Sequence, residues 1–526
     1  MLVLIDGRSV YSPLFSGVFW DAQDVLMADI ERIEVLSGPG ATIWGVNAVN
    51  GVINVITKTA AATQGALVAA TYGEPENGAL FRFGGRLDNG MHMRIYGKST
   101  ELADGVNATG TRRYTGMIRR QAGFRADLDI DSGSLRLSGD AYQGRLDQMN
   151  TRDMHTAGAN LAGTYTGKTA GGGDLRVHLI IDHTQRDQPN AFREHLNTLE
   201  AEAQHGMRSG RHTIVWGGGY RRAWDRIVNG PGYGFLPANL RMSWANLFAQ
   251  DEVALTERLR ATAGLKLEYN HYTGNELLPN LRLAYALSEH HLFWGSLART
   301  VRAPSRIDRD FYSPIDPLLV NGVPRYAVGG GPNFVSEVAR VAELGYRGQP
   351  RQHLSWSATV WVADYDRRRT LEPARGGPAQ LSNLGEGRSR GIETWMRWTV
   401  TPHWRLDGGA VIQHISTWTQ PASRDIFAGT GIATNDPRRR YTLRSSHDIS
   451  PASQFEWSLR YVGALPRPAV PSYHEVDLHW IWTPNPRLDI MVSGQNLLKR
   501  SHPEFGAAAN RSVHQRAVLL SAAYRF

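Results

Sequence analysis

Apolar and polar residues alternate along many segments of about ten residues, from about residue 65 to the end of the chain. In 259–270, Leu, Ala and Tyr at the odd positions alternate with residues such as Arg, Lys and Glu. The same pattern recurs in 91–95 and 475–482. A period of two places successive side chains on opposite faces of a β-strand. The chain is therefore predicted to consist mainly of strands with one apolar face.

The connections between these segments alternate between short and long. Short turns are expected at 88–90, 256–258, 401–402 and 483–486. Long polar and aromatic connections are expected at 184–196, 222–240, 301–336, 366–387 and 417–437. Short turns at one rim, long loops at the other and an even strand number are typical of outer-membrane barrels. With nine strands before residue 245 and thirteen after it, we predict an all-β fold: a 22-stranded antiparallel transmembrane β-barrel.

The last predicted strand alternates to the final residue and includes Tyr524 and Phe526. Bacterial barrels commonly end on such an aromatic residue, so we interpret these two residues as the signal for insertion by the barrel-assembly machinery. Tryptophans are predicted to form girdles at the membrane interfaces. Those expected in the girdles are Trp356, Trp361, Trp395, Trp398, Trp480 and Trp482.

The first 62 residues follow a different pattern. Three short β-branched runs, at 3–5, 33–36 and 52–56, predict buried strands, and Asp21 is placed to cap a short helix through 25–27. This composition predicts a small α/β unit. Because a 22-stranded barrel is wide enough to leak, we expect this unit to lie in its lumen as a plug.

Several classes of function are excluded or disfavoured. The chain has no cysteine, which rules out disulfides, thiol catalysis and cysteine metal sites. Phosphate-binding loops, a Gly-x-Ser-x-Gly elbow and a His-Glu-x-x-His pair are missing, so we do not expect an enzyme. Arginines are spread along the chain instead of clustered, which argues against nucleic-acid binding. Scattered histidines show no ligand spacing, and we predict neither a metal site nor an intrinsic cofactor.

Several short motifs stand out along the chain. They are 3–8, 30–35, 38–41, 44–45 and 50–58 in the first 62 residues, and 246–252, 299–304, 391–393 and 494–498 in the predicted barrel. Together these motifs resemble TonB-dependent receptors, and the resemblance covers essentially the whole chain. The residues that carry the plug resemblance are Asp6, Gly7, Glu34, Gly38, Pro39, Gly45, Gly51 and Asn54. The resemblance assigns 1–62 to the C-terminal part of a plug and 63–526 to the receptor barrel. Ser37 stands where many relatives have an arginine that locks the plug, so this lock is expected to be altered or absent.

The resemblance implies a monomeric outer-membrane receptor that imports a scarce chelate, most often a ferric siderophore, with heme and cobalamin as alternatives. Its partners would be the TonB energising complex, the barrel-assembly machinery, outer-membrane lipid and lipopolysaccharide. Relatives carry a signal peptide, a coupling segment and the first half of the plug before the position of Met1, so we expect the chain as written to be unable to perform energised uptake. The alternative is a passive or structural barrel, such as a pore, an adhesin or a phage docking site.

The ligand site is expected where the plug apex meets the extracellular loops. The candidates on the plug are Arg8, Tyr11, Phe15, Phe19 and Trp20, although its aromatic residues could instead pack the plug against the barrel. The candidates in the longest loop are Arg302, Arg306, Arg309, Asp310, Phe311, Tyr312 and Tyr326, which could meet an anionic aromatic chelate or form local ion pairs. The basic run 367–369 could bind ligand or lipopolysaccharide phosphates. We expect trimming of residues 305–330 to abolish ligand binding while the barrel still folds.

Overall fold

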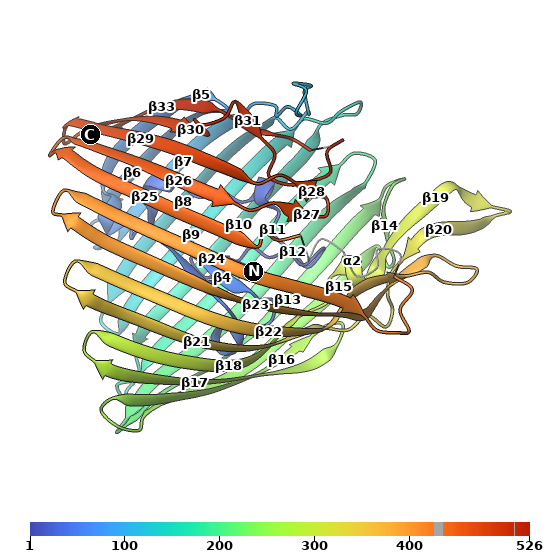
Figure 1. Ribbon diagram of the computed structural model, residues 1–526, viewed down its shortest axis with the longest axis horizontal. Helices are drawn as coiled ribbons and strands as arrows, with labels where there is room; N and C mark the ends of the chain where they lie inside the picture. Colours follow the sequence, from blue (N-terminus) through green and yellow to red (C-terminus); the bar gives the residue numbers. More distant parts are fainter. Residues whose placement is uncertain (426–434, 510) are drawn as a thin grey trace.

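The computed structural model describes residues 1–425, 435–509 and 511–526, and it is a closed barrel with a small domain inside it (Figure 1). Within these residues, no helix has the length and apolar character needed to cross a membrane. The 22 wall strands are β5 (Gly65–Glu74), β6 (Glu76–Arg86), β7 (His92–Leu102), β8 (Met117–Ile130), β9 (Gly133–Leu146), β10 (Met154–Lys168), β11 (Asp174–Gln188), β12 (Phe192–Ser209), β13 (His212–Asn229), β15 (Asn239–Ala254), β16 (Leu259–Asn270), β17 (Gly274–Ser288), β18 (His291–Arg302), β21 (Glu337–Arg351), β22 (Leu354–Glu372), β23 (Ala379–Thr401), β24 (Trp404–Thr419), β25 (Arg439–Ser450), β26 (Ser453–Val462), β29 (Tyr473–Asn485), β30 (Leu488–Gln495) and β33 (Ala517–Arg525).

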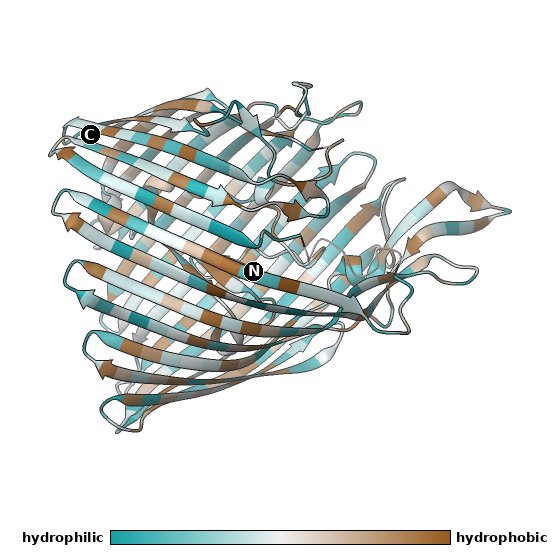
Figure 2. Ribbon diagram, in the orientation of Figure 1, coloured by the Kyte–Doolittle hydropathy of each residue, from teal (hydrophilic) through white to brown (hydrophobic). Residues whose placement is uncertain are grey.

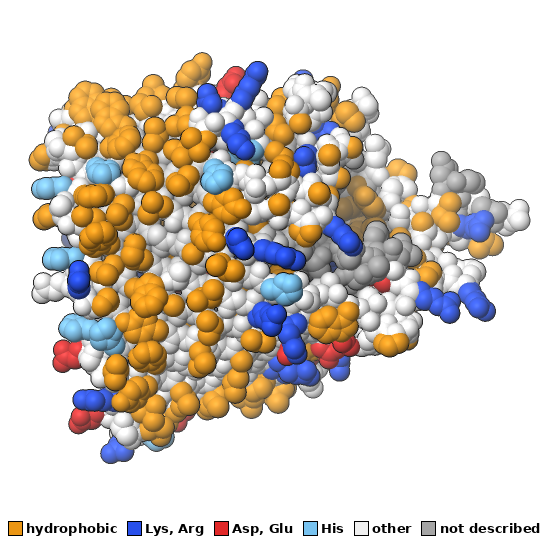
Figure 3. Space-filling model, in the orientation of Figure 1, with side chains coloured by type: hydrophobic (Ala, Val, Ile, Leu, Met, Phe, Trp, Pro, Cys, Tyr) orange, Lys and Arg blue, Asp and Glu red, His pale blue; other side chains and the backbone are white. Residues whose placement is uncertain are grey.

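The predicted 22-stranded antiparallel barrel is confirmed. Alternation sorts the side chains as expected: Leu265 and Leu267 are 47% and 45% exposed on the outer surface, whereas Lys266 between them is buried in the lumen. Figure 2 shows the alternating bands along each strand, and Figure 3 shows hydrophobic side chains spread over the barrel wall. This outer apolar surface suits the lipid phase of a membrane.

The short turns lie where the sequence predicts them. Between β6 and β7 only 87–91 are outside the strands, and between β23 and β24 only 402–403. The long connections predicted at 184–196, 222–240 and 366–387 are shorter than expected, because the strands continue as ribbons past the predicted strand ends. The connection predicted at 301–336 is found at 303–336. Strands β11 and β12 are separated by 189–191 alone, so the connection predicted at 184–196 is wrong in extent. Of the connection predicted at 417–437, residues 426–434 lie outside the described residues.

The longest connection, between β18 and β21, has structure of its own. It contains the short helix α2 (Arg306–Asp310) and a hairpin formed by β19 (Phe311–Val320) and β20 (Val323–Gly329). The hairpin projects from the end of the barrel opposite the short turns (Figure 1). Its base pairs with the short strand β14 (Gly234–Phe235) of the neighbouring loop. Other loops carry the pairs β27 (Leu465–Pro466) with β28 (Ala469–Val470) and β31 (Ser501–His502) with β32 (His514–Gln515).

Pairing of the last strand β33 with the first strand β5 closes the barrel. Tyr524 and Phe526 are exposed on the outer surface, with ring centroids 4.8 Å apart, and the Phe526 amide donates to the Ala66 carbonyl. Trp480 and Trp482 are also exposed, as the girdle prediction requires. The girdle prediction is wrong for Trp361, whose ring packs in a cluster with Val49 of the plug and therefore faces the lumen. It is also wrong for Trp395, because the pairing of β22 with β23 places this residue on the same face as Trp361.

Residues 1–57 include a four-stranded sheet in the order β2-β1-β4-β3. Its strands are β1 (Leu2–Ile5), β2 (Arg8–Ser9), β3 (Ile30–Ser37) and β4 (Gly51–Thr57). Strand β1 is parallel to β4, and β3 is antiparallel to it, so the three predicted strands form one sheet. The predicted helix capped by Asp21 is absent from this described segment. Two single 3-10 turns, η1 (Trp20–Ala22) and η2 (Met27–Asp29), replace it because the chain here follows the barrel wall.

Apolar contacts fix the plug sheet to the wall at two places. Val46, after the short helix α1 (Ala41–Trp44), packs with Leu278 and Val301 of β17 and β18. Leu14, in the loop after β2, packs with Ile227 of β13 and with Phe235. These clusters place the plug apex directly below the loop between β18 and β21.

Candidate functional site

Arginines of the barrel wall form ion pairs with acidic residues of the plug. Asp29, at the end of η2, is 1% exposed and lies 2.6 Å from Arg82 and 3.2 Å from Arg94. These two side chains project from β6 and β7. Charge-assisted hydrogen bonds are stronger than neutral ones, and their strength increases when water is excluded. The pair of arginines therefore anchors one side of the plug.

A second group of wall cations binds the segment that carries η1. Arg186 of β11 donates to both carboxylate oxygens of Asp21, at 2.6 and 2.7 Å, and its guanidinium lies 3.8 Å from the centre of the Phe19 ring. Lys98 of β7 pairs with Asp24 at 2.6 Å. Asp21 is thus a barrel contact and not a helix cap.

The plug motif residues are explained by close packing. The Asp6 carboxylate accepts hydrogen bonds from the Thr57 amide and hydroxyl, at 2.9 and 2.7 Å, which joins the ends of β1 and β4. Gly38 has a φ of +82°, and a Cβ there would meet the Glu343 carboxylate of β21. Gly45 has a φ of +77° and lies against Glu268 of β16. Glycine is required where the backbone is left-handed and a wall carboxylate approaches it.

The remaining motif residues lie on or beside β3 and β4. Glu34 accepts hydrogen bonds from Arg32 and from Asn54, at 2.8 and 3.1 Å, across these two strands. Gly51 has a φ of +136°, and a Cβ there would meet the Leu36 carbonyl. Pro39 follows Gly38 in the turn between β3 and α1. Ser37, the last residue of β3, precedes the site where Gly38 meets Glu343.

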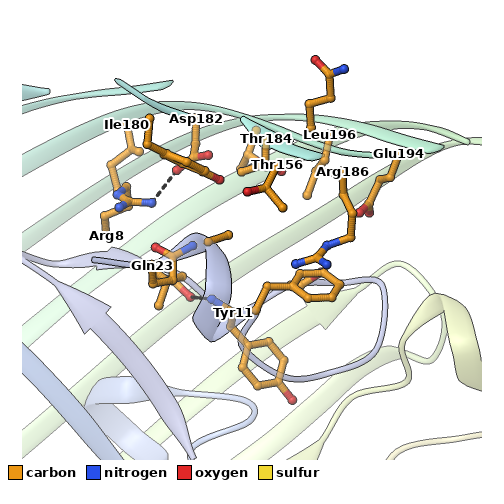
Figure 4. Close-up of a pocket in the computed structure, with 18 of the residues that line it drawn as sticks. Arg8, Tyr11, Gln23, Thr156, Ile180, Asp182, Thr184, Arg186, Glu194 and Leu196 are labelled. Atoms are coloured by element: carbon orange, nitrogen blue, oxygen red, sulfur yellow. Dashed lines mark hydrogen bonds and ion pairs between the residues drawn. The ribbon is translucent and has the colours of Figure 1, made fainter. Parts of the chain in front are cut away.

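A cavity of about 60 Å³ separates the plug from the wall strands β9 to β13 (Figure 4). Arg8 reaches across one side of it and pairs with Asp182 of β11 at 2.7 Å. Glu194 of β12 lines the other side, is 4% exposed, and has one carboxylate oxygen without a hydrogen-bond partner among the described residues. The wall side of the cavity therefore carries charged side chains.

The first residues of the loop between β18 and β21 are bound tightly to both the plug and the barrel wall. Ser305 caps α2 through a reciprocal pair of hydrogen bonds with Asp308. The amides of Arg306 and Ile307 donate to the carbonyls of Pro13 and Leu14 in the plug, at 3.0 and 2.8 Å. The first residues of 305–330 therefore join the loop to the plug, and the expectation that the barrel folds without 305–330 stays a prediction.

The charged residues predicted in this loop are mostly engaged in ion pairs. Arg306 is fully buried and pairs with Asp225 at 2.7 Å and with Asp310 at 3.1 Å. Asp310 also accepts a hydrogen bond of 2.6 Å from the Tyr272 hydroxyl. Arg309 donates to the Phe334 carbonyl at 2.6 Å.

Asp308 forms ion pairs with two further arginines. Arg302 pairs with Asp308 at 2.9 Å and also with Glu337, and Arg369 of the basic run pairs with Asp308 at 3.2 Å. The pKa of Asp308 is lowered: burial alone would raise it, but the nearby Arg302 and Arg369 outweigh that effect. The two ion-pair groups stabilise α2 in one position above the plug.

The aromatic residues predicted for the ligand site differ in how far their side chains are exposed to solvent. Phe15 and Phe19 pack with the Leu14 cluster, and Phe311 joins the same cluster from the loop. Tyr11 packs with the plug core, where burial raises its pKa to about 12. Trp20 is 63% exposed. In the projecting hairpin, the partly exposed rings of Tyr312 and Tyr326 lie 5.0 Å apart.

Sequence reasoning did not single out the wall cations that hold the plug, which are Arg82, Arg94, Lys98, Arg119, Arg125, Arg136 and Arg186. A signal for them existed, because each has the parity of the lumen face on its strand. Alternation alone does not say which part of the lumen face the plug covers, so these cations could not be told from solvated ones.

The comparisons with known proteins cover both parts of this arrangement. The family model "TonB dependent receptor-like, beta-barrel" matches residues 63–497, and the "TonB-dependent Receptor Plug Domain" matches residues 1–52. The chain belongs to the TonB-dependent receptor family. Members of this family are receptors and transporters, and the chain is an integral β-barrel of the outer membrane.

Individual relatives of this TonB-dependent receptor are distant. An iron-regulated outer membrane virulence protein of Vibrio cholerae is 24% identical over 401 residues, which are 72% of this chain and 58% of the relative. A ferric enterobactin receptor of Pseudomonas aeruginosa is 24% identical over 384 residues, 58% of this chain and 51% of the relative. The chain thus spans less than two thirds of the length of these curated relatives.

Among solved structures, the siderophore receptor PirA from Pseudomonas aeruginosa matches with a TM-score of 0.77 at 18% identity. The match covers all of this chain and 91% of that chain. At this identity the likeness concerns the fold alone, and the fold agrees with the barrel and plug described above.

Proposed function

We propose that this TonB-dependent receptor binds a ferric siderophore at its extracellular side and imports it with energy transmitted by TonB. The proposal divides the chain into a plug region, 1–62, and a barrel, 63–526. The main support is a plug held in the lumen by ion pairs, such as those of Asp29 with Arg82 and Arg94, since ion pairs can break and re-form when a force acts. The names of the relatives, which include ferric enterobactin receptors, suggest the class of cargo.

The proposed ligand surface consists of the exposed candidates. Tyr312 and Tyr326 on the hairpin and Trp20 on the plug are available to an aromatic, anionic chelate. The buried candidates, among them Arg306 and Asp310, have the different role of holding α2 against the plug. Ligand contact at the hairpin would then reach the plug through the hydrogen bonds of Arg306 and Ile307.

The test replaces residues 313–327 of the hairpin with a short turn, which leaves α2 and Ser305 in place. A matched control shortens 107–111, at the tip of the loop between β7 and β8. Binding of a panel of ferric siderophores to purified protein and uptake of radioactive iron in a receptor-deleted strain would be measured. We expect the hairpin variant to lose binding while both variants keep a heat-modifiable barrel. Unchanged affinity for every bound siderophore would contradict the proposed site.

A passive pore is the second candidate function, and one observation favours it. Lumen-facing Arg397 of β23 and Arg444 of β25 are 66% and 54% exposed, so the plug does not cover this part of the wall. A water-filled gap there would conduct small ions without energy. Conductance of the purified chain in planar bilayers distinguishes the candidates: a steady open current at low voltage supports a pore, and a closed channel contradicts it.

A further inference from the structure

A loop at the extracellular end of the barrel brings together side chains that metal ions commonly use as ligands. The loop between β30 and β33 carries His502 and Glu504, and strand β29 contributes Glu475. One donor atom from each of the three lies within 4.8 Å of the others. Glu475 and His502 are 3% exposed, so the group is largely shielded from bulk water.

The hydrogen bonds of His502 determine which ring nitrogen carries its proton. Asn496 is fully buried, and its amide nitrogen donates to the His514 carbonyl at 3.0 Å. The Asn496 side-chain oxygen must therefore accept, at 3.1 Å, from Nδ1 of His502. The Nε2 lone pair of His502 is then directed at a carboxylate oxygen of Glu504, 3.3 Å away. Two acceptors face each other, and a positive charge between them would stabilise the pair.

Because Nδ1 of His502 donates to Asn496, His502 presents Nε2 as its ligand atom. A ring nitrogen whose partner nitrogen donates to an amide oxygen is the usual arrangement of a metal-binding histidine. The ring also stacks on Tyr473, with centroids 4.0 Å apart, so its orientation is fixed before any ligand arrives.

A second histidine lies beside the group, in contact with Glu475. His514 lies directly across from His502 in the pairing of β31 with β32, and its Nε2 is 3.4 Å from a carboxylate oxygen of Glu475. Ligands bound at 2.0–2.2 Å in a tetrahedral site are about 3.3–3.6 Å apart. The two histidine–carboxylate distances already match this spacing.

The guanidinium of Arg460 lies between the carboxylates of Glu475 and Glu504. Arg460 of β26 donates from Nε to Glu475 at 2.9 Å and from Nη2 to Glu504 at 2.9 Å. Its side chain is 44% exposed, so it can move toward solvent without leaving a cavity. Arg460 shows that the two carboxylates hold a cation at this point, and a metal ion would compete with it.

We propose that Glu475, His502 and Glu504, with His514 beside them, form a binding site for a divalent first-row transition-metal cation. Imidazole and carboxylate ligands are suited to Zn²⁺ and its neighbours. Binding would displace Arg460 and link the loop that carries β31 and β32 to β29. The proposal concerns the metal alone and does not rest on siderophore import.

The test measures Zn²⁺ binding to the purified full chain in detergent by calorimetry, and Co²⁺ binding by its visible absorption. We expect one saturable site. Glu504→Gln keeps acceptors for Arg460 and Tyr473 but loses the charge, and should weaken Zn²⁺ binding at least tenfold, as should His502→Gln. Arg460→Gln removes the competing cation and should strengthen binding about tenfold.

The matched control is His183→Ala with His195→Ala, a second histidine pair whose ring centroids are 6.3 Å apart on β11 and β12. This control should leave Zn²⁺ affinity and stoichiometry unchanged, and heat-modifiable mobility verifies that each variant is folded. Absence of saturable binding in the folded wild type, or equal affinity in wild type and the folded Glu504→Gln variant, would overturn the proposal. Weaker binding in Arg460→Gln would also overturn it, because it would show that Arg460 supports the site.

Discussion

Two parts of the barrel wall carry arginines at similar distances from the short turns but in opposite environments. Arg82 lies four residues before the end of β6, and its side chain is 9% exposed against Asp29 of the plug. Arg397 lies four residues before the end of β23, and its side chain is 66% exposed beside Asp407 of β24. We call β6 to β11 the contact wall and β23 to β26 the open wall. The plug, and not the strand pattern, makes one arginine an anchor and leaves the other solvated.

The ion pairs of the two walls contribute different free energies to the stability of the plug. Exposed ion pairs contribute at most about 1 kcal/mol, whereas removal of one partner from a buried pair leaves an uncompensated charge and costs about 3–5 kcal/mol. The contact wall therefore determines how firmly the plug is held.

The largest expected effect comes from Asp29→Ala, which leaves Arg82 and Arg94 buried without their carboxylate. The plug should lose about 3–5 kcal/mol of its free energy of unfolding. The control, Asp407→Ala, leaves two exposed arginines, Arg397 and Arg405, and should cost less than about 1 kcal/mol. Urea titration of the plug, followed separately from barrel unfolding on heat-modifiability gels, measures both. Equal losses in the two variants would contradict the division into two walls.

A smaller effect is expected from Gly38→Ala, at the close approach of the plug to β21. The left-handed backbone and the contact with Glu343 should together cost about 2 kcal/mol or more of plug stability. Gly163→Ala in β10 is the control, because a Cβ there meets nothing within 4 Å. The same urea titration applies, and a stability equal to the control would show that the plug can move away from β21 at little cost.

Alkaline pH should weaken the plug through Tyr11. Burial raises the pKa of Tyr11 in the folded plug from 10 to about 12, so the stability it contributes is complete below pH 10 and falls as the pH rises toward 12. The loss amounts to about 2 kcal/mol at the end of this range. Tyr11→Phe should flatten this part of the pH profile of plug unfolding. Identical profiles for variant and wild type would show that Tyr11 is exposed to water in solution.

The smallest effect is expected from Ser37→Arg, which restores the residue type found in many relatives. The new guanidinium would lie near Glu343, which accepts a hydrogen bond of 2.8 Å from Ser296. A partly exposed ion pair should add less than about 1 kcal/mol to plug stability. Ser37→Lys and Ser37→Gln separate charge from size, and a gain with Gln as large as with Arg would exclude an ion pair as the cause.

The barrel was predictable because its signal is local. Alternation in 259–270 gives strand β16 and the outward direction of Leu265 and Leu267 without reference to any other strand. The helix expected after Asp21 failed for the opposite reason. Asp21 does not cap a helix because its carboxylate binds Arg186. This arginine is 165 residues away in the sequence, so a local pattern does not reveal the contact.

The candidate site was predictable only in part. The plug apex and the β18-to-β21 loop do meet, as expected, through Leu14 and Ile307. The sequence could not tell that Arg306 is fully buried while Trp20 is exposed, because both lie in segments without periodicity. Likewise, His502 and Glu504 are two residues apart, but Glu475 joins them only through the folding of the loop back onto β29.

By itself, the sequence determined the secondary structure of the wall, the number of its strands and the family, since these depend on side-chain alternation and on motifs of neighbouring residues. Only the tertiary structure decided which lumen-facing charges are anchors and which are solvated. The physical reason is that the free energy of a charge depends on the water around it, and the removal of that water by the plug at Arg82, but not at Arg397, is a property of the whole fold.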